Sequence, residues 1–358
     1  TGKEIWRNKL GGIVLYASPV FHEGYVYIGT YDNFLYCINS KTGNTKWRFN
    51  AGGKISSSVL TANGKVYFGC EDGYMYCIRS ETGEELWRFK TGDWLCSQPA
   101  FSNNKILFGS GDSNFYCLDS ESGKEIWRFR TGAEIVNLNN TTVLNDIVFV
   151  TSFDNNLYAV DVNSGEEMWR FKTGKYGISA APVIHDNVLY QGCRDGILYA
   201  LTLKGKEIWR FKTEKEVMGV PVFNDDLIFV GSCDNSFYAL DYDGKEKWRY
   251  ETGGFIFMKP ALWRDCVIFT SWDCNLYSVN VFNGEEVWRF QTSNKNMTSI
   301  PPAYKWFSLE IKRNLKPYDT NTEEKYKTDI KTEDIISEYT VKSEYVMKSE
   351  YRQESEYR

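Results

Sequence analysis

The sequence lacks the features that would place it in several large classes of protein. No apolar run approaches the roughly 18 residues that a membrane-spanning helix needs. The net charge is -5 and the isoelectric point is about 5.4, so there is no overall basic field for nucleic acid. Before Pro302 no segment keeps the 3.6-residue apolar period of an amphipathic helix. These absences argue against a helical membrane protein and a nucleic-acid partner, and they favour an all-β fold.

Catalytic motifs are also lacking. The chain has two histidines, His22 and His185, and both fall in predicted turns, where surface positions are expected. No GxSxG, Walker A or HExxH stretch occurs. The sequence therefore predicts no catalytic residue.

Cysteine is not scarce, but its nine copies are an odd number and form no CxxC pair or Cys/His cluster. Cys37, Cys77 and Cys117 share one register of a repeat in which other copies carry Ala or Ser, so we interpret them as small buried residues. No metal site is predicted. Many thiols favour a reducing compartment, the cytoplasm. Because the chain opens with Thr1 and could be a processed form or fragment, a cell-envelope or secreted location is the alternative.

What the chain does contain is a repeat of about 40 residues, exemplified by Asp72 to Phe89. An Asp is followed four residues later by a Tyr, then by a turn Gly, and four residues after that by a Trp–Arg pair. The Asp recurs seven times, at Asp32, Asp72, Asp112, Asp154, Asp195, Asp234 and Asp273. The Trp recurs eight times, at Trp6, Trp47, Trp87, Trp127, Trp169, Trp209, Trp248 and Trp288. A fixed period of this size indicates a repeat architecture.

Each repeat is predicted to form four short strands. In the second repeat these are Ile55–Leu60, Lys65–Cys70, Tyr74–Arg79 and Glu85–Lys90. Asn63-Gly64 and Thr82-Gly83 provide turn residues between them. Four strands per unit, repeated, are typical of a β-propeller. The Trp would pack on the neighbouring blade, and the Arg after it would lie on a solvated rim beside nearby carboxylates.

The ends of the chain set the predicted number of blades. A Pro lies 12–13 residues after most of the Trp residues, and after Trp288 this offset reaches Pro301, so an eighth unit begins at Met297. Residues 1–10 would form one strand that completes this last blade and closes the ring. We therefore predict eight four-stranded blades within residues 1–315, with seven blades as the alternative. Residues 316–358 form a charged tail with a six-residue SEY repeat, predicted to be disordered or an added strand.

The repeat resembles the quinoprotein-type, or PQQ-like, propeller repeat. The resemblance rests on the Tyr-(Ala/Cys)-(Leu/Ile/Val)-Asp/Asn run, the Thr-Gly turn and the Trp; residues 158–169, YAVDVNSGEEMW, are a close match to that family's tryptophan-docking motif. It covers about residues 1–303. The family includes PQQ-dependent, quinoprotein alcohol dehydrogenase-like enzymes and BamB-like scaffolds without a cofactor.

The scaffold branch fits this chain better than the enzymes do. The resemblance implies that an enzyme would carry long insertions, a calcium site and often adjacent cysteines, whereas the Trp spacings here are 39–42 residues and no two cysteines are adjacent. Asp241 and Asp243 resemble the start of a calcium loop, but Gly244 comes too early in it. We therefore expect neither PQQ nor calcium, with a PQQ- and calcium-dependent dehydrogenase as the alternative function.

A partner is expected where the repeats are free to differ. The residue before the recurring Asp varies in type, and it includes aromatic and Arg side chains of the kind that dominate protein interfaces. The predicted partner-binding residues are Tyr31, Glu71, Phe153, Arg194 and Trp272. Trp94, Tyr176 and Phe255 would lie in loops on the same face. The sequence predicts a monomeric, non-catalytic scaffold for a protein or peptide, although these aromatics could instead cap the core under each loop.

Overall fold

The computed structural model describes residues 5–14, 17–136 and 141–292, and all of them belong to one compact unit, Glu4–Ile311. Every regular element in this part of the chain is a β-strand. The strands form seven sheets of four, each sheet taking consecutive strands in chain order. We number these sheets blade 1 (β1–β4) to blade 7 (β25–β28). No helix able to cross a membrane occurs among the described residues.

The strands have the following bounds. The first strands of the blades are β1 (Val20–His22), β5 (Leu60–Ala62), β9 (Ala100–Ser102), β13 (Thr142–Leu144), β17 (Val183–His185), β21 (Val222–Phe223) and β25 (Ala261–Trp263). The second strands are β2 (Tyr25–Gly29), β6 (Lys65–Gly69), β10 (Lys105–Gly109), β14 (Ile147–Thr151), β18 (Val188–Gly192), β22 (Ile228–Gly231) and β26 (Cys266–Ser271). The third strands are β3 (Phe34–Asn39), β7 (Tyr74–Arg79), β11 (Asn114–Asp119), β15 (Asn156–Asp161), β19 (Ile197–Thr202), β23 (Ser236–Leu240) and β27 (Asn275–Asn280). The fourth strands are β4 (Thr45–Asn50), β8 (Glu85–Lys90), β12 (Glu125–Arg130), β16 (Glu167–Lys172), β20 (Glu207–Lys212), β24 (Glu246–Glu251) and β28 (Glu286–Gln291).

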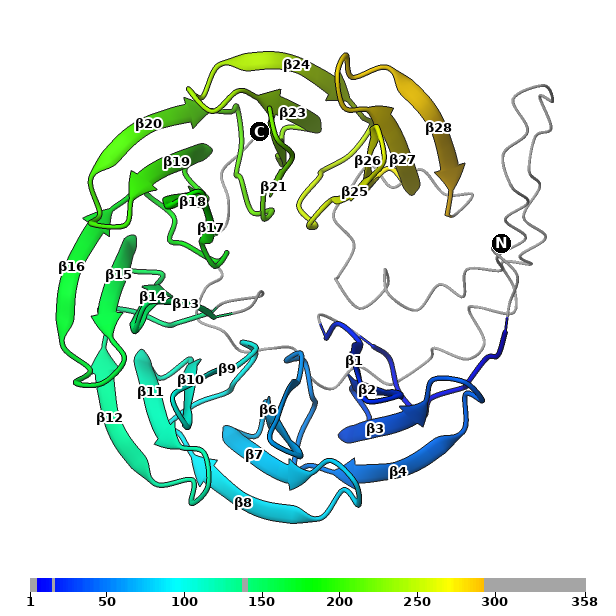
Figure 1. Cartoon of the computed structure of the whole chain (residues 1–358), viewed down its shortest axis with the longest axis vertical. Helices are drawn as coiled ribbons and strands as arrows, with labels where there is room; N and C mark the ends of the chain where they lie inside the picture. The colour runs from blue at the N-terminus through cyan, green and yellow to red at the C-terminus, as the bar shows by residue number, and fades with distance from the viewer. Residues whose placement is uncertain (1–4, 15–16, 137–140, 293–358) are drawn as a thin grey trace, which may run out of the picture. The chain divides into compact units, whose positions relative to one another are not determined.

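The blades follow one another around a common centre, with the first strands nearest to it and the fourth strands on the rim (Figure 1). This arrangement confirms the predicted all-β fold of repeated four-stranded antiparallel blades. The described residues contain seven such blades, the number given above as the alternative. The eighth blade predicted from Met297 onward, and the tail after residue 315, lie outside the described residues.

The prediction for the N-terminal strand was wrong for the residues that the structure describes. Residues 5–14 form no strand there. A strand needs a neighbour that satisfies its backbone groups, and the neighbour expected for this one falls beyond residue 292. Trp6 nevertheless reaches blade 1: its indole N–H donates to the Ser40 carbonyl at 2.6 Å, and the ring lies against Gly43.

The first strands are shorter than predicted. β5 comprises only Leu60–Ala62, because the preceding segment makes other hydrogen bonds. The Ile55 amide donates to the Thr30 carbonyl of blade 1 at 3.2 Å. The Ser57 hydroxyl donates to the Gly69 carbonyl at 2.8 Å and accepts from the Gly69 amide at 3.0 Å. A side chain thus replaces the backbone pairing that a longer strand would need.

A β-bulge recurs where the third and fourth strands pair. In blade 3, Trp127 pairs with Cys117 and Glu125 with Leu118, so the register shifts by one residue between them. Regular alternation would place residues three apart on opposite faces of a strand. The bulge places Glu125 and Arg128 on the same face of the strand, and Arg128 Nη2 lies 2.6 Å from Glu125 Oε2. The same pairing holds the rim arginines of blades 4 to 7.

The hydrophobic core lies between neighbouring blades. One cluster joins Leu35 and Cys37 of blade 1 to Val66 and Phe68 of blade 2, and equivalent clusters join the later pairs. The fourth-strand Trp completes each junction by donating its indole N–H to a carbonyl of the next blade at 2.8–3.1 Å in six cases, Trp47, Trp87, Trp127, Trp169, Trp209 and Trp248. For Trp288 the following segment lies outside the described residues.

Candidate partner-binding face

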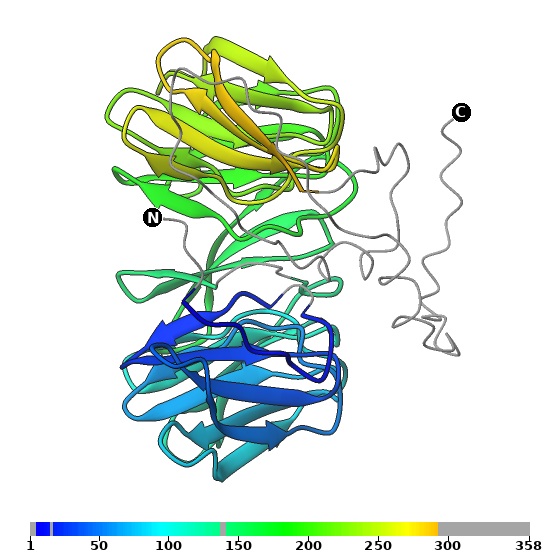
Figure 2. The same ribbon diagram turned by 90° about the vertical axis from the view of Figure 1, so that its right-hand side faces the viewer.

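The loops of each blade gather at two opposite ends of its strands (Figure 2). One end carries the loops between the second and third strands and the segments that lead from each fourth strand to the next blade. We call it the Asp-loop face, because the recurring Asp residues lie there. Backbone hydrogen bonds tie its two kinds of loop together: the amide of Glu71 donates to the Lys54 carbonyl at 2.9 Å, and that of Trp272 to the Phe255 carbonyl at 2.9 Å.

The recurring Asp holds each of these loops in place. In blade 3, Asp112 Oδ1 accepts from the Asn114 amide at 2.9 Å. Its Oδ2 accepts from the Tyr116 hydroxyl and from the Gly92 amide, both at 2.7 Å. The Tyr–Asp bond measures 2.6–2.8 Å in all seven blades. These carboxylates are therefore engaged in fixing the loops, as their recurrence in every blade suggested.

The electrostatics of the pair follow from these contacts. Burial raises the pKa of Asp112, but hydrogen bonds from Tyr116, Gly92 and Asn114 outweigh this effect and lower the pKa below its usual value. Burial and the Asp partner raise the pKa of each tyrosine, and burial is the larger cause. The Asp therefore stays ionised and the Tyr protonated at neutral pH.

All five predicted partner-binding residues lie on the Asp-loop face and are half-buried. The structure brings two of them together: the Arg194 guanidinium carbon lies 5.5 Å from the centre of the Phe153 ring. Tyr31, Glu71 and Trp272 lie in other blades. The Trp272 ring packs on two neighbours from the preceding loop, Phe255 at 5.7 Å and Phe257 at 5.2 Å between ring centres.

Sequence reasoning missed two cations on this face. Lys54 Nζ lies 5.0 Å from the centre of the Tyr31 ring, and Lys215 Nζ lies 5.2 Å from that of Phe255. Both come from segments that lead into a blade, where residue type varies between repeats as it does before the Asp. For Lys54 this variation could have been recognised in the sequence. The position directly before the buried aliphatic residue holds Lys54 in one repeat and Trp94 in the next.

Charged side chains of both signs lie on the face. Glu71, Asp93 and Glu134 lie over blades 2 to 4, where burial and the nearby charge of Asp93 raise the pKa of Glu134. Arg194 and Lys215 lie over blades 5 and 6 together with aromatic rings. Lys54 beside Glu71, and Glu214 and Glu216 beside Lys215, mix the two signs within each half of the face.

The turn that resembled a calcium loop does not fit a cation site. Asp241 Oδ1 accepts from the backbone amides of Asp243 and Lys245 at 3.0 and 2.9 Å. Asp241 Oδ2 is paired with Lys247 Nζ at 3.1 Å. The carboxylate thus stabilises the turn between β23 and β24 and carries a cationic partner already. The described part of the chain contains no cluster of three or more His, Cys, Asp or Glu residues suited to a metal ion.

Comparison with known proteins assigns the fold to a family. The model of the family described as "outer membrane protein assembly factor BamB" matches residues 1–92, 71–213 and 194–308. The chain belongs to the BamB family. A search of curated proteins finds no match to this chain. The resemblance to a BamB-like propeller repeat inferred from the sequence is thus confirmed.

Solved structures share the fold of this BamB-family chain. BamB from Moraxella catarrhalis is 19% identical with a TM-score of 0.60, and the match covers 69% of this chain and 79% of that one. A computationally designed protein, Ika8, is 17% identical with a TM-score of 0.67, covering 81% of this chain and 91% of that one. At such identities the likeness concerns the fold alone.

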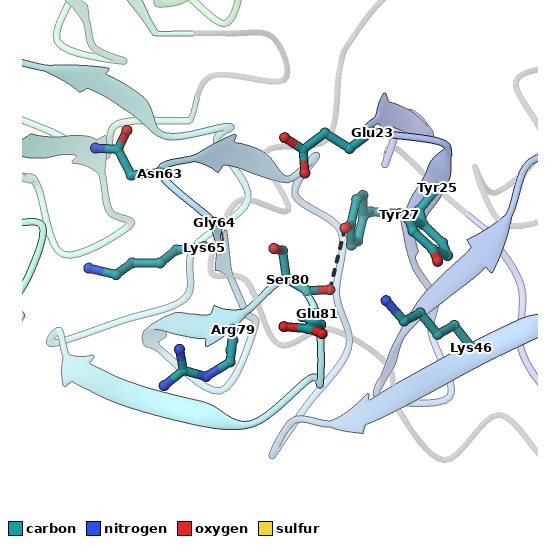
Figure 3. A pocket seen from close by; sticks show the side chains of 10 residues that line it. All are labelled: Glu23, Tyr25, Tyr27, Lys46, Asn63, Gly64, Lys65, Arg79, Ser80 and Glu81. Atoms are coloured by element: carbon teal, nitrogen blue, oxygen red, sulfur yellow. Dashed lines mark hydrogen bonds between the residues drawn. The ribbon is translucent and has the colours of Figure 1, made fainter.

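The opposite end of the BamB-family blades carries a cavity of about 380 Å³ between blades 1 and 2 (Figure 3). Its ten lining residues mix cations, carboxylates and phenols, and none is a histidine, a cysteine or a predicted partner-binding residue: Glu23, Tyr25, Tyr27, Lys46, Asn63, Gly64, Lys65, Arg79, Ser80 and Glu81. Lys65 Nζ is already paired with Glu121 at 2.5 Å.

His185 departs from its expected place in a surface turn. It is the last residue of β17 and packs between blades, its ring stacked on Phe223 with 4.5 Å between ring centres. Its Nε2 lies 3.0 Å from the Tyr242 hydroxyl, which donates to the Asn224 carbonyl at 2.5 Å. His185 therefore joins blade 5 to blade 6, a structural role that the sequence did not indicate.

Proposed function

We propose that this BamB-family propeller is a non-catalytic scaffold that binds a protein or peptide at its Asp-loop face. The observation that carries the proposal is the concentration of varied aromatic and cationic side chains on loops that the Asp–Tyr pairs hold rigid. Aromatic and Arg side chains dominate protein interfaces, and Tyr and Trp lose little entropy on binding because they have only two rotatable bonds. A rigid frame lowers the cost of ordering them. The family description, an assembly factor, supports a role in binding proteins.

The test is a pull-down from extracts of the source cells. The triple variant Tyr31→Ala/Phe153→Ala/Trp272→Ala removes three aromatic anchors from the face. We expect it to lose partners that the wild type retains. The matched control, Ile126→Ala/Ile208→Ala/Val287→Ala, truncates exposed apolar side chains of the fourth strands and should keep every partner.

Thermal unfolding must show that both triple variants remain folded. If the folded face variant keeps every partner, the site lies elsewhere on the molecule. If the rim control loses the same partners as the face variant, binding depends on the rim or on the whole propeller.

We further propose that the scaffold is monomeric and cytoplasmic, with the cell envelope as the alternative compartment. The number of thiols supports a reducing environment. Burial raises the pKa of Cys70 and of Cys233 to about 12, which leaves these thiols protonated and unreactive. Fractionation of source cells distinguishes the compartments, and light scattering gives the mass of the particle.

A further inference from the structure

Arg194 differs from the rim arginines in having no acidic partner. Each rim arginine of blades 3 to 7 is paired with the Glu three residues before it, as Arg170 is with Glu167 at 2.6 Å. Among the described residues no carboxylate lies within ion-pair distance of Arg194, and its Nε is sealed from solvent without a hydrogen-bond acceptor. A buried donor left unpaired destabilises the folded protein, and more so when it is charged. Nε itself is out of a ligand's reach, but a negatively charged group bound at the terminal Nη atoms would stabilise the delocalised charge of the whole guanidinium.

The surroundings hold the Arg194 side chain in position. Its neighbour Asp195 fixes the loop through Oδ2, which accepts from the Gly174 amide at 2.7 Å and the Tyr199 hydroxyl at 2.8 Å. The guanidinium carbon lies over the Phe153 ring, a cation–π contact that uses none of the N–H groups. The ring itself packs against Gly177, where an added Cβ would come within 2.6 Å of it.

The residue before Gly177 is an exposed aromatic one. Tyr176 is 60% exposed and has a φ of 81°, a conformation that is strained for a bulky residue. The adjacent Gly177 amide donates to Asn155 Oδ1 at 2.8 Å, which holds the segment in this conformation. Strained residues held by their surroundings are common at binding sites. An apolar group of a ligand bound at Arg194 would lie close to the Phe153 ring, beside the segment that carries Tyr176.

We infer that Arg194 binds a carboxylate of a partner peptide, either an Asp or Glu side chain or the C-terminal carboxylate, flanked by an apolar residue. A carboxylate matches the planar donor fork of the guanidinium in two parallel hydrogen bonds. A polyanion fits less well, because Glu214 and Glu216 lie in the adjoining loop and the chain carries a net charge of -5. This inference rests on the proposed function, since it names the chemistry of the peptide that the same face would bind.

The test begins with selection of random nonapeptides on the purified full-length chain, in one library with free C-termini and in one with the peptides internal to a carrier. Enrichment of Asp or Glu in the internal library indicates a side-chain carboxylate. Enrichment confined to the free-end library indicates a terminal one. Calorimetry then gives the Kd of the best peptide and of its amide counterpart, with Asn, Gln or a terminal amide in place of the acid.

We expect Arg194→Gln to raise the Kd of the acidic peptide at least about tenfold. Replacing that peptide by its amide counterpart should raise the Kd for the wild type by a similar factor, but should change the Kd for the variant little. Arg194→Lys keeps the charge but loses the planar set of N–H donors, so its Kd should lie between those of the wild type and Arg194→Gln. The matched control is Arg264→Gln, because Arg264 also lies over an aromatic ring, Trp263 at 5.7 Å, but in the turn after β25 at the opposite end of the blade. It should leave the Kd unchanged.

Three results would overturn the inference: no peptide enriched, enriched peptides without a required carboxylate, or equal Kd values for the wild type and Arg194→Gln. The proposed function is judged separately. Peptides that bind without a carboxylate, or a pull-down in which the triple face variant loses its partners, leave the scaffold role in place. It fails if that folded variant keeps every partner.

Discussion

At the scale of single residues, each fourth-strand tryptophan joins two blades through one hydrogen bond and one packed ring. The Trp87 indole N–H donates to the Ser120 carbonyl at 3.1 Å, and its ring lies so close to Gly123 that an added Cβ would be 2.6 Å away. Burial of the ring contributes more than the hydrogen bond, which is worth about 1 kcal/mol. The ring is half-buried rather than fully enclosed.

Trp87→Ala should lower the free energy of unfolding by about 3–5 kcal/mol, toward the lower end because the ring is half-buried. Trp87→Phe keeps an aromatic ring and removes the N–H donor, so it should lower the free energy of unfolding by less. Urea unfolding followed by circular dichroism measures both. Arg88→Ala is the control and should change stability little, because Arg88 and its partner Glu85 are exposed. A change in Tm below about 1 °C for Trp87→Ala would contradict the packing role.

At the scale of elements, the turn glycines differ in what their missing side chain permits. Gly64, between β5 and β6, and Gly83, between β7 and β8, both have positive φ, 71° and 75°. An added Cβ at Gly64 would meet nothing within 4 Å, whereas at Gly83 it would come within 2.8 Å of the Trp47 ring. The first turn therefore needs glycine for its backbone alone, and the second also needs it for the junction between blades.

Gly64→Ala should cost about 1 kcal/mol of unfolding free energy, the penalty of a left-handed backbone. Gly83→Ala should cost about 1–3 kcal/mol more, because the methyl group displaces the Trp47 indole. Parallel urea unfolding curves of the two variants check the difference. Equal losses would show that the ring moves aside freely, and that its contact with the turn contributes little.

At the scale of the whole molecule, the expectation that no cofactor binds depends on the length of the loops and on the residues that they carry. The Trp spacings of 39–42 residues allow only short loops, and the Asp241 carboxylate is held by its own turn and by Lys247. Because family membership by itself does not determine activity, the assignment depends on such residues.

We expect neither PQQ nor calcium to bind with micromolar affinity or better. Equilibrium dialysis followed by absorbance measures PQQ binding, and calorimetry measures calcium. Dye-linked alcohol oxidation in the presence of both measures turnover, with an established quinoprotein dehydrogenase run beside it to validate the assay. Sustained turnover by this chain would establish the alternative, a PQQ-dependent dehydrogenase.

The sequence by itself determined the features that every repeat shares. A fixed period places the Trp, the turn Gly and the Asp–Tyr pair at equivalent points, and these interactions lie within one blade or link equivalent positions of adjacent blades. The strand type, the blade as a unit and the family could therefore be predicted. The strand bounds were least certain in the first strands, where Ser57 takes over hydrogen bonds that a longer strand would make.

Only the tertiary structure decided which residues of different repeats meet. The Phe153–Arg194 contact joins blade 4 to blade 5, and the His185–Phe223 stack joins blade 5 to blade 6. The bulge that pairs Arg128 with Glu125 likewise depends on the neighbouring strand. The Phe153–Arg194 and His185–Phe223 contacts link positions that differ between repeats, so no period predicts them. The sequence distinguishes Arg194 by its place before a recurring Asp, but its lack of an acidic partner follows from the packing around it.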